Sequence, residues 1–196
     1  MTPYELIAIG ASWGGLSATQ QILSGLPADF PPAIVLAQHR AVDSRRDRLV
    51  SVLSARSPLP VREAGDKDGI QGGRVYVAPP DYHLLVEPHG FALSIDEPVG
   101  FSRPSIDVLM ESAADAYGSR MIGVILTGAS ADGAAGLELV RRRGGLTIVQ
   151  DPATAERSEM PQAAIAAGAA ERVVPLIEIA PLLMDACGQP TGGRAA

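Results

Sequence analysis

The chain has 196 residues, of which 46% are hydrophobic, 19% charged and 4% aromatic, and this length favours one compact domain with a sizeable core. Its 21 glycines and 16 prolines are spread without a period, which excludes a collagen-like chain and indicates many turns rather than disorder. The formal net charge of −6 argues against nucleic acid as a partner, because phosphate binding depends on positive charge.

The sequence also indicates the compartment. The single cysteine, Cys187, cannot form an intrachain disulfide, which suits a reducing environment. The N-terminus lacks the basic region of a signal peptide. No stretch approaches the roughly 20 apolar residues that span a bilayer. We therefore expect a soluble cytoplasmic protein without direct membrane insertion.

Short apolar runs alternate with helical patterns along most of the chain. Strands are predicted at residues 6–9, 33–38, 121–126, 146–150 and 173–174, and helices at 16–26, 44–56, 104–117, 132–143, 161–167 and 177–186. Between residues 60 and 95, strands at 61, 74–78, 84–86 and 91–95 lie close together, with a hairpin at 88–90. This pattern predicts an α/β fold: a doubly wound, mainly parallel sheet with helices on both faces and a small antiparallel hairpin region. We interpret residues 1–187 as a single domain and 188–196 as a mobile C-terminal tail.

Polar residues directly follow three of the predicted strands. Ser12 lies in the turn after the first strand, His39 follows the second, and Asp132 lies in the segment after the strand at 121–126. In open α/β sheets, ligands bind outside the carboxyl ends of the strands. The topology therefore brings a serine, a histidine and an aspartate to one edge of the sheet.

Each of these residues also has a simpler interpretation. Ser12 fits a tight strand-to-helix turn, His39 a hydrogen-bonded structural residue, and Asp132 the N-cap of the helix that follows it. The first turn also resembles a dinucleotide-binding loop. However, Ser12 replaces its middle glycine, and the second strand ends in Gln38-His39 instead of the acidic residue that would hold a ribose. The nucleotide interpretation is therefore weak.

Together, the three residues have the chemistry of a serine hydrolase. A serine hydroxyl needs a base to remove its proton, and an imidazole is the best base when a carboxylate fixes its tautomer. Ser12 also precedes a predicted helix, whose N-terminal N–H groups favour a developing oxyanion. The segment 10–14 fits the G-x-S-x-G nucleophile elbow, but the chain order Ser, His, Asp differs from that of α/β-hydrolases, so we do not assign that fold.

Six motifs occur in a characteristic order along the chain. They are IGASWGG (9–15), AQHR (37–40), VYVAPPDYHL (75–84), SRPSID (102–107), LTGASADGAAG (126–136) and the segment 144–161. In this order and spacing they resemble the catalytic domain of the chemotaxis protein-glutamate methylesterases, the CheB family. The resemblance covers about residues 4–185.

The resemblance implies hydrolysis of glutamyl methyl esters on the cytoplasmic helices of methyl-accepting chemoreceptors, with deamidation of receptor glutamines in many members. By this resemblance, Ser12 is the nucleophile, His39 the general base and then acid, and Asp132 the residue that orients the imidazole. The backbone N–H groups of Trp13 and Ala129 are the implied oxyanion donors. No metal or organic cofactor is implied, and the sequence contains no metal-ligand motif.

The chain departs from the family pattern in three respects. The best-known members carry an N-terminal receiver domain, whereas the first strand here begins within the first ten residues. We therefore expect regulation by a partner, such as a separate receiver-domain protein. Trp13 stands where threonine is common, and Ala129-Ser130 replaces a commoner Met-Gly pair. Both changes alter the mouth of the site rather than the three catalytic residues.

Some interpretations stay open at this stage. Arg103, Ser105 and Asp107 lie at the start of a predicted helix, where they would either line the receptor groove or serve as caps and a surface salt bridge. The function also has two alternatives to a protein methylesterase. One is a serine esterase that acts on a small-molecule ester. The other is a non-catalytic regulatory binding module, against which the presence of all three catalytic residues argues.

Overall fold

The computed structural model describes residues 4–39 and 46–188. Seven strands form one sheet in the order β3-β4-β2-β1-β7-β8-β9, in which every neighbouring pair is parallel. Their bounds are β1 Leu6–Ala11, β2 Ala33–Gln38, β3 Val61–Glu63, β4 Val75–Val77, β7 Met121–Ile125, β8 Leu146–Gln150 and β9 Arg172–Val174. Two further strands, β5 (His83–Glu87) and β6 (Gly90–Ser94), form an antiparallel hairpin. The predicted parallel sheet and small hairpin region are confirmed.

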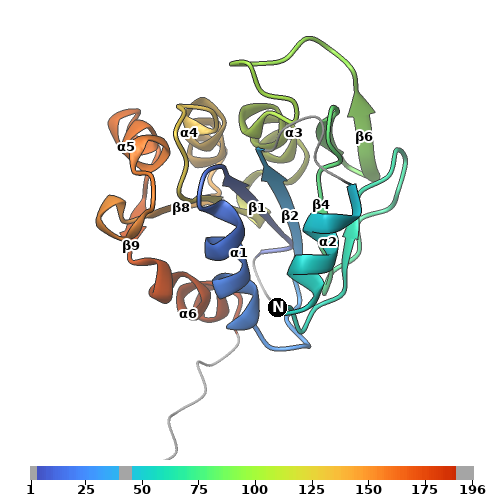
Figure 1. Cartoon of the computed structure of the whole chain (residues 1–196), viewed down its shortest axis with the longest axis horizontal. Coiled ribbons are helices and arrows are strands. Elements are labelled where there is room, and N and C mark those ends of the chain that lie inside the picture. Colours follow the sequence, from blue (N-terminus) through green and yellow to red (C-terminus); the bar gives the residue numbers. More distant parts are fainter. Residues whose placement is uncertain (1–3, 40–45, 189–196) are drawn as a thin grey trace, which may run out of the picture.

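In the part of the chain that the structure describes, six α-helices cover the sheet on both faces (Figure 1). They are α1 Gly15–Ser24, α2 Arg46–Ser54, α3 Ile106–Tyr117, α4 Ala134–Arg142, α5 Glu159–Ala166 and α6 Leu176–Ala186. Helices α1, α2 and α6 pack on one face, and α3, α4, α5 and the hairpin on the other. Short 3-10 turns occur at Gly118–Arg120 and Pro152–Thr154. None of the helices described is both long enough and apolar enough to span a bilayer.

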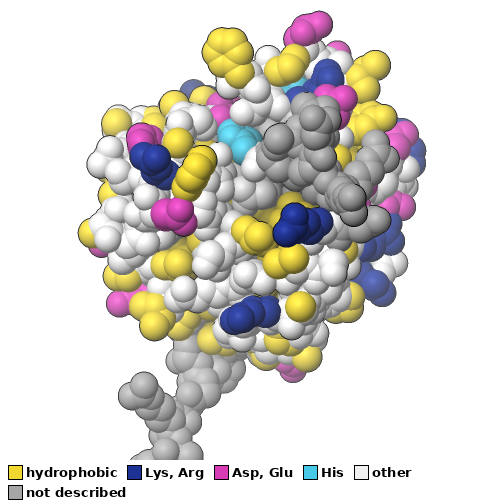
Figure 2. All heavy atoms as spheres, in the orientation of Figure 1, with side chains coloured by type: hydrophobic (Ala, Val, Ile, Leu, Met, Phe, Trp, Pro, Cys, Tyr) yellow, Lys and Arg dark blue, Asp and Glu magenta, His cyan; other side chains and the backbone are white. Residues whose placement is uncertain are grey.

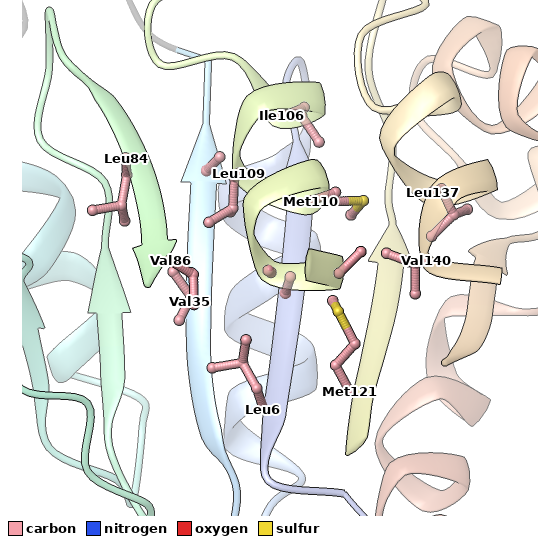
Figure 3. Packing of buried hydrophobic residues seen from close by; sticks show 14 of the residues in the cluster. Leu6, Val35, Leu84, Val86, Ile106, Leu109, Met110, Met121, Leu137 and Val140 are labelled. Carbon is pink, nitrogen blue, oxygen red and sulfur yellow. The ribbon is translucent and has the colours of Figure 1, made fainter. Parts of the chain in front are cut away.

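The central strands are apolar throughout because both of their faces are covered. Successive side chains of a strand point to opposite faces. In β1, Leu6 and Ala8 therefore join the core beneath α3 and α4, whereas Ile7 and Ile9 join the core beneath α1 and α6. Figure 3 shows the first of these cores, in which side chains of the sheet meet the apolar faces of α3 and α4 and the hairpin.

Two helices begin later than the sequence predicts. The expected helix at 104–117 places Pro104 in its first turn, but Ser105 is the N-cap of α3 and Ile106 its first residue. Asp132, expected to cap its own helix, is not the N-cap of α4. That position belongs to Gly133, whose φ of 98° lies in the left-handed region that favours glycine. The Asp132 carboxylate instead accepts backbone N–H groups at the start of α3.

The other predicted helices agree with the structure to within a few residues at each end. The expected helix start at residue 44 lies outside the described residues. So do the first three residues of the chain and the expected tail beyond Gly188.

The strand order places β1 between β2 and β7, at the point where the chain reverses its direction of winding across the sheet. Open α/β sheets bind their ligands at such a switch point. The start of α3 lies over this edge, since any Cβ on Gly10 of β1 would collide with the Ile106 side chain. The loops after β1, β2 and β7 thus converge beside the first turn of α3.

Candidate active site

A buried pair of side chains, His39 and Asp132, lies at the switch point. His39 directly follows β2, and its Nε2 lies 2.7 Å from Oδ2 of Asp132. The His39 side chain is 12% exposed and that of Asp132 only 3%. Because a neutral imidazole with its proton on Nε2 carries its lone pair on Nδ1, this contact leaves Nδ1 as the basic nitrogen.

The Asp132 carboxylate is held by the N-terminus of α3. Oδ1 accepts hydrogen bonds from the Ser105 hydroxyl (2.8 Å) and the Asp107 N–H (3.0 Å), and Oδ2 accepts one from the Ile106 N–H (2.7 Å). Burial alone would raise the pKa of Asp132, but the bonds from His39, the two N–H groups and Ser105 outweigh it and lower the pKa. Asp132 is therefore an anion at neutral pH that fixes the orientation of the imidazole.

Ser12 lies in the turn between β1 and α1 and is half-buried. Its N–H donates to the Thr127 carbonyl (3.0 Å), and its carbonyl accepts from Nε2 of Gln38 (2.7 Å). A Cβ added to Gly128 would lie 2.9 Å from the Ser12 Cβ, so glycine is required where the β7 loop passes the serine. The backbone of Ser12 is thus anchored to the loops that follow β2 and β7.

Buried polar side chains at the strand ends join these loops into one unit. Gln38, at the end of β2, donates from Nε2 to the carbonyls of both Ser12 and His39 (2.7 and 3.1 Å). Thr127, after β7, donates from Oγ1 to the Trp13 carbonyl (2.9 Å). Gln150, at the end of β8, accepts the Thr127 N–H at Oε1 (2.9 Å). The loops that carry Ser12 and His39 are therefore held to neighbouring strand ends by hydrogen bonds of 2.7–3.1 Å.

Two backbone donors lie where the sequence predicts an oxyanion site. Trp13 directly follows Ser12 and precedes α1, and Ala129 lies in the exposed part of the β7 loop. Neither N–H donates a hydrogen bond within the part of the chain that the structure describes. Free N–H groups beside a helix N-terminus can stabilise a negatively charged oxygen.

Trp13 is 60% exposed and contacts the loop between β8 and α5. Its indole Nε1 donates to Glu156 Oε1 (2.7 Å), and the guanidinium of Arg157 lies 5.5 Å from the ring centroid. This contact fixes a large aromatic surface next to Ser12.

A cavity of about 470 Å³ opens beside Ser12 and His39 and extends between α1 and α2. Its wall is mainly apolar, formed by Leu16, Leu49 and Val52, with Gln20, Gln38 and Arg48 as polar members. On this face of the molecule, Figure 2 shows a histidine at the surface and hydrophobic side chains grouped around a basic one. The cavity can hold part of a substrate next to the serine.

Among the described residues, the hydroxyl that contacts the imidazole belongs to Ser102, not to Ser12. Ser102 Oγ lies 3.5 Å from Nδ1 of His39. Ser102 ends a tight turn, closed by two backbone hydrogen bonds with Val99. The nitrogen that is free to act as a base is thus flanked by a serine other than Ser12.

Two of the three residues considered for the receptor groove, Arg103 and Ser105, have structural roles. Ser105 is fully buried (0% exposed) and bonds to Asp132, so the expectation that it lines an open groove is wrong. Arg103 pairs with Asp81 (Nη2–Oδ1, 2.6 Å) and donates to the carbonyls of Ile95 and Asp96 (2.9 and 3.0 Å). Arg103 therefore braces the loop after β6, as the salt-bridge interpretation requires.

Sequence reasoning missed several members of the site. Gln38 and Ser102 lie within the recurring motifs AQHR and SRPSID, and that was the available signal for them. Glu156 gave no signal, because its contact depends on a tryptophan 143 positions away in the chain. Within residues 4–39 and 46–188, no group of three His, Cys, Asp or Glu side chains is placed to hold a metal ion.

Comparison with known proteins shows the family to which the chain belongs. The family model described as CheB methylesterase matches residues 7–183. The chain belongs to the CheB methylesterase family. The resemblance of its six motifs to this family is confirmed, and so is the α/β fold. The crystal structure of the Thermotoga maritima CheB methylesterase catalytic domain superposes with a TM-score of 0.89 at 34% identity, covering 93% of this chain and 98% of that one.

Relatives of this CheB-family chain differ in length. A protein of Leptospira interrogans is 48% identical over 183 residues, which are 92% of this chain and 94% of the relative. The protein-glutamate methylesterase/protein-glutamine glutaminase of Mesorhizobium japonicum is 44% identical over 97% of this chain, which spans only 56% of that relative. The protein-glutamate methylesterase FrzG of Myxococcus xanthus is also 44% identical, and the match covers 55% of it.

Proposed function

We propose that this chain is a protein-glutamate methylesterase, with Ser12 as nucleophile, His39 as general base and then acid, and Asp132 as the residue that orients the imidazole. One observation carries the proposal: the buried His39–Asp132 pair adjoins a cavity whose wall includes Ser12. Family membership and the names of the relatives support the same reaction.

The first half-reaction forms an acyl-enzyme. His39 takes the Ser12 proton at Nδ1, because Nε2 is held by Asp132. Ser12 Oγ attacks the carbonyl carbon of the glutamyl methyl ester, and the N–H groups of Trp13 and Ala129 stabilise the oxyanion. Collapse of this intermediate breaks the bond to the methoxy oxygen. The imidazolium then donates its Nδ1 proton, so that methanol leaves.

The second half-reaction repeats the same proton movements with water. His39 accepts a proton from water at Nδ1, and the resulting hydroxide attacks the acyl carbon. The imidazolium returns the proton to Ser12 Oγ as the free glutamate departs. The Asp132 anion stabilises the imidazolium in both halves. A glutamine side chain would follow the same course with ammonia as the leaving group, which gives a protein-glutamine glutaminase.

We infer that the protein substrate is the cytoplasmic helical region of a methyl-accepting chemoreceptor. The cavity between α1 and α2 would receive the residues next to the methyl ester, with Trp13 at the other side of Ser12. The enzyme would then act in the cytoplasm, without nucleic acid, membrane insertion, metal or organic cofactor. A separate receiver-domain protein is our candidate for its regulator.

The experiment is to incubate the protein with membranes that contain radiolabelled methylated receptors and to count the released methanol. Ser12→Ala should abolish release, and Ser102→Ala should retain it. If Ser12→Ala kept near wild-type release and Ser102→Ala lost it, Ser102 would be the nucleophile and the proposed assignment would be wrong. Hydrolysis of small esters without release from receptors would refute the proposed substrate.

A further inference from the structure

The first turns of α3 and α4 are linked by reciprocal hydrogen bonds from two aspartates. Asp132, in the loop before α4, accepts the N–H groups of Ile106 and Asp107 at the start of α3 (2.7 and 3.0 Å). In return, Asp107 of α3 accepts the N–H groups of Gly133 and Gly136 at the start of α4 (2.9 and 2.7 Å). The first turn of α3 thus binds an aspartate from the loop before α4, and the start of α4 binds an aspartate from α3.

Glycines allow these hydrogen bonds by letting the two helices approach closely. A Cβ on Gly136 would lie 2.9 Å from the carbonyl oxygen of Asp107 and 3.0 Å from its Cα. A Cβ on Gly133 would lie 2.6 Å from Ile106 side-chain atoms, and φ at Gly133 is 98°. Both glycines therefore lie where a side chain would push the helices apart.

Through these hydrogen bonds, Asp107 is linked directly to Asp132, which pairs with His39. Its carboxylate binds the N–H of Gly133, and Gly133 directly follows Asp132 in the chain. Its own backbone N–H binds the Asp132 carboxylate. We propose that Asp107 is a positioning residue: by holding the turn at Gly133–Gly136, it keeps Asp132 in the orientation that His39 requires. This inference rests on the proposed function, because it assigns a role relative to the same imidazole.

Charge supports the same role. Burial, followed by the negative charge of Asp132, raises the pKa of Asp107 to about 6, although the N–H groups of Gly133 and Gly136 act in the opposite direction. The groups of α3 and α4 that bond to this pair are uncharged, namely backbone N–H groups and the Ser105 hydroxyl. His39, at the end of β2, is the ionisable group on the other side of Asp132. The N–H groups of Gly133 and Gly136 therefore hold the Asp107 carboxylate in place against the repulsion from Asp132.

Three variants separate geometry from charge. Asp107→Ala removes both the acceptor and the charge. Asp107→Asn removes the charge but keeps an Oδ1 that can accept both N–H groups. Asp115→Asn is the matched control, because it removes a charge from the same helix at an exposed position, where Asp115 pairs with Arg143. The first readout is the NMR signal of the His39 Nε2 proton, which reports its bond to Asp132 without any substrate.

We expect a downfield-shifted Nε2 proton in the wild type, in Asp107→Asn and in Asp115→Asn, and its loss in Asp107→Ala. In the methanol-release assay, Asp107→Ala should lower kcat by about 10- to 100-fold, the range that a small misplacement of a catalytic group produces. KM should stay within about twofold, because Asp107 does not line the cavity beside Ser12.

The two failures can be distinguished. An Asp107→Ala variant that keeps the downfield proton and wild-type kcat would overturn the positioning role and leave Asp107 as a helix cap only. A wild-type protein that shows the proton but releases no methanol from receptors would refute the proposed function. In that case the NMR comparison alone would decide the role of Asp107.

Discussion

Replacing Asp132 by asparagine should destabilise the fold as well as stop catalysis. The carboxylate accepts four hydrogen bonds, from His39, Ser105 and the backbone N–H groups of Ile106 and Asp107. Asparagine offers one oxygen and one NH₂ group, and the NH₂ cannot accept. Whichever way the amide is turned, its NH₂ faces one of the two buried backbone N–H groups of α3.

The expected loss of stability follows from the one backbone N–H that would face the amide NH₂. The Ser105 hydroxyl can rotate and the imidazole can change tautomer, but a backbone N–H cannot adapt. Leaving one buried N–H unsatisfied costs about 1–3 kcal/mol. Loss of the negative charge at the N-terminus of α3 adds about 0.3–1 kcal/mol. A total of about 1–4 kcal/mol is a large fraction of the roughly 5–15 kcal/mol by which a domain is stable.

Catalysis should suffer by a separate route. An amide NH₂ that faces Nε2 selects the tautomer with the proton on Nδ1, which then cannot accept a proton from Ser12. The equivalent tautomer error in serine proteases lowers kcat by about 10⁴-fold.

The assay is urea unfolding followed by circular dichroism, together with methanol release. Asp115→Asn is the control and should lie within about 0.5 kcal/mol of the wild type, as surface substitutions do. If Asp132→Asn also unfolded within that interval, the start of α3 would not depend on Asp132, and our account of the carboxylate would be wrong.

Three further predictions concern the residues around the proposed catalytic triad. Gln38→Leu removes the donor that joins the carbonyls of Ser12 and His39, so we expect a lower kcat and a lower melting temperature. Gln162→Leu, at an exposed position, is the control. Equal losses of kcat and melting temperature in both variants would contradict this role of Gln38. The pKa of Asp107 is raised in the folded state to about 6. Its contribution to stability is therefore complete below the unfolded value and lost as pH rises through about 6. Compared with the wild type, Asp107→Asn should therefore show a larger increase in free energy of unfolding at about pH 8 than at about pH 5. Denaturant titrations that show the same increase at both pH values would refute the raised pKa of Asp107. Trp13→Phe removes the exposed bond to Glu156 and should change stability by less than about 1 kcal/mol while raising KM for receptors. An unchanged KM would mean that the indole does not set the substrate mouth.

The sequence predicts the sheet, its covering helices and the strand ends that carry Ser12, His39 and Asp132. These predictions succeed because buried parallel strands are apolar throughout and because the loops after them share one edge. The apolar runs are visible in the sequence itself, and the shared edge follows from the general geometry of parallel sheets.

The partner of Asp132 could not be predicted in the same way. A local rule assigns an aspartate before a helix to the N-cap of that helix. Here Gly133 takes the cap position, and Asp132 turns to N–H groups that lie 25 and 26 residues away in the chain. That choice depends on how α3 packs against α4, which no local pattern reveals. The same holds for the use of Nε2 rather than Nδ1 by His39, since it follows from where α3 places Asp132.

Positioning and recognition are divided between different parts of this site. The turn that carries Ser12, the proposed nucleophile, is bonded to β2 through Gln38 and to the loop after β7 through Thr127, at 2.7–3.0 Å. The base is tied through Asp132 to the capped ends of α3 and α4. Side chains held in this way need no reorganisation when a substrate binds, which is how a preorganised site lowers a barrier. The side chains of Trp13, 60% exposed, and of Phe101, fully exposed on the turn that ends in Ser102, make no buried hydrogen bond to residues 4–39 or 46–188. Substitutions in the tied residues should therefore change kcat, whereas substitutions in the exposed aromatic residues should change which substrates reach the serine.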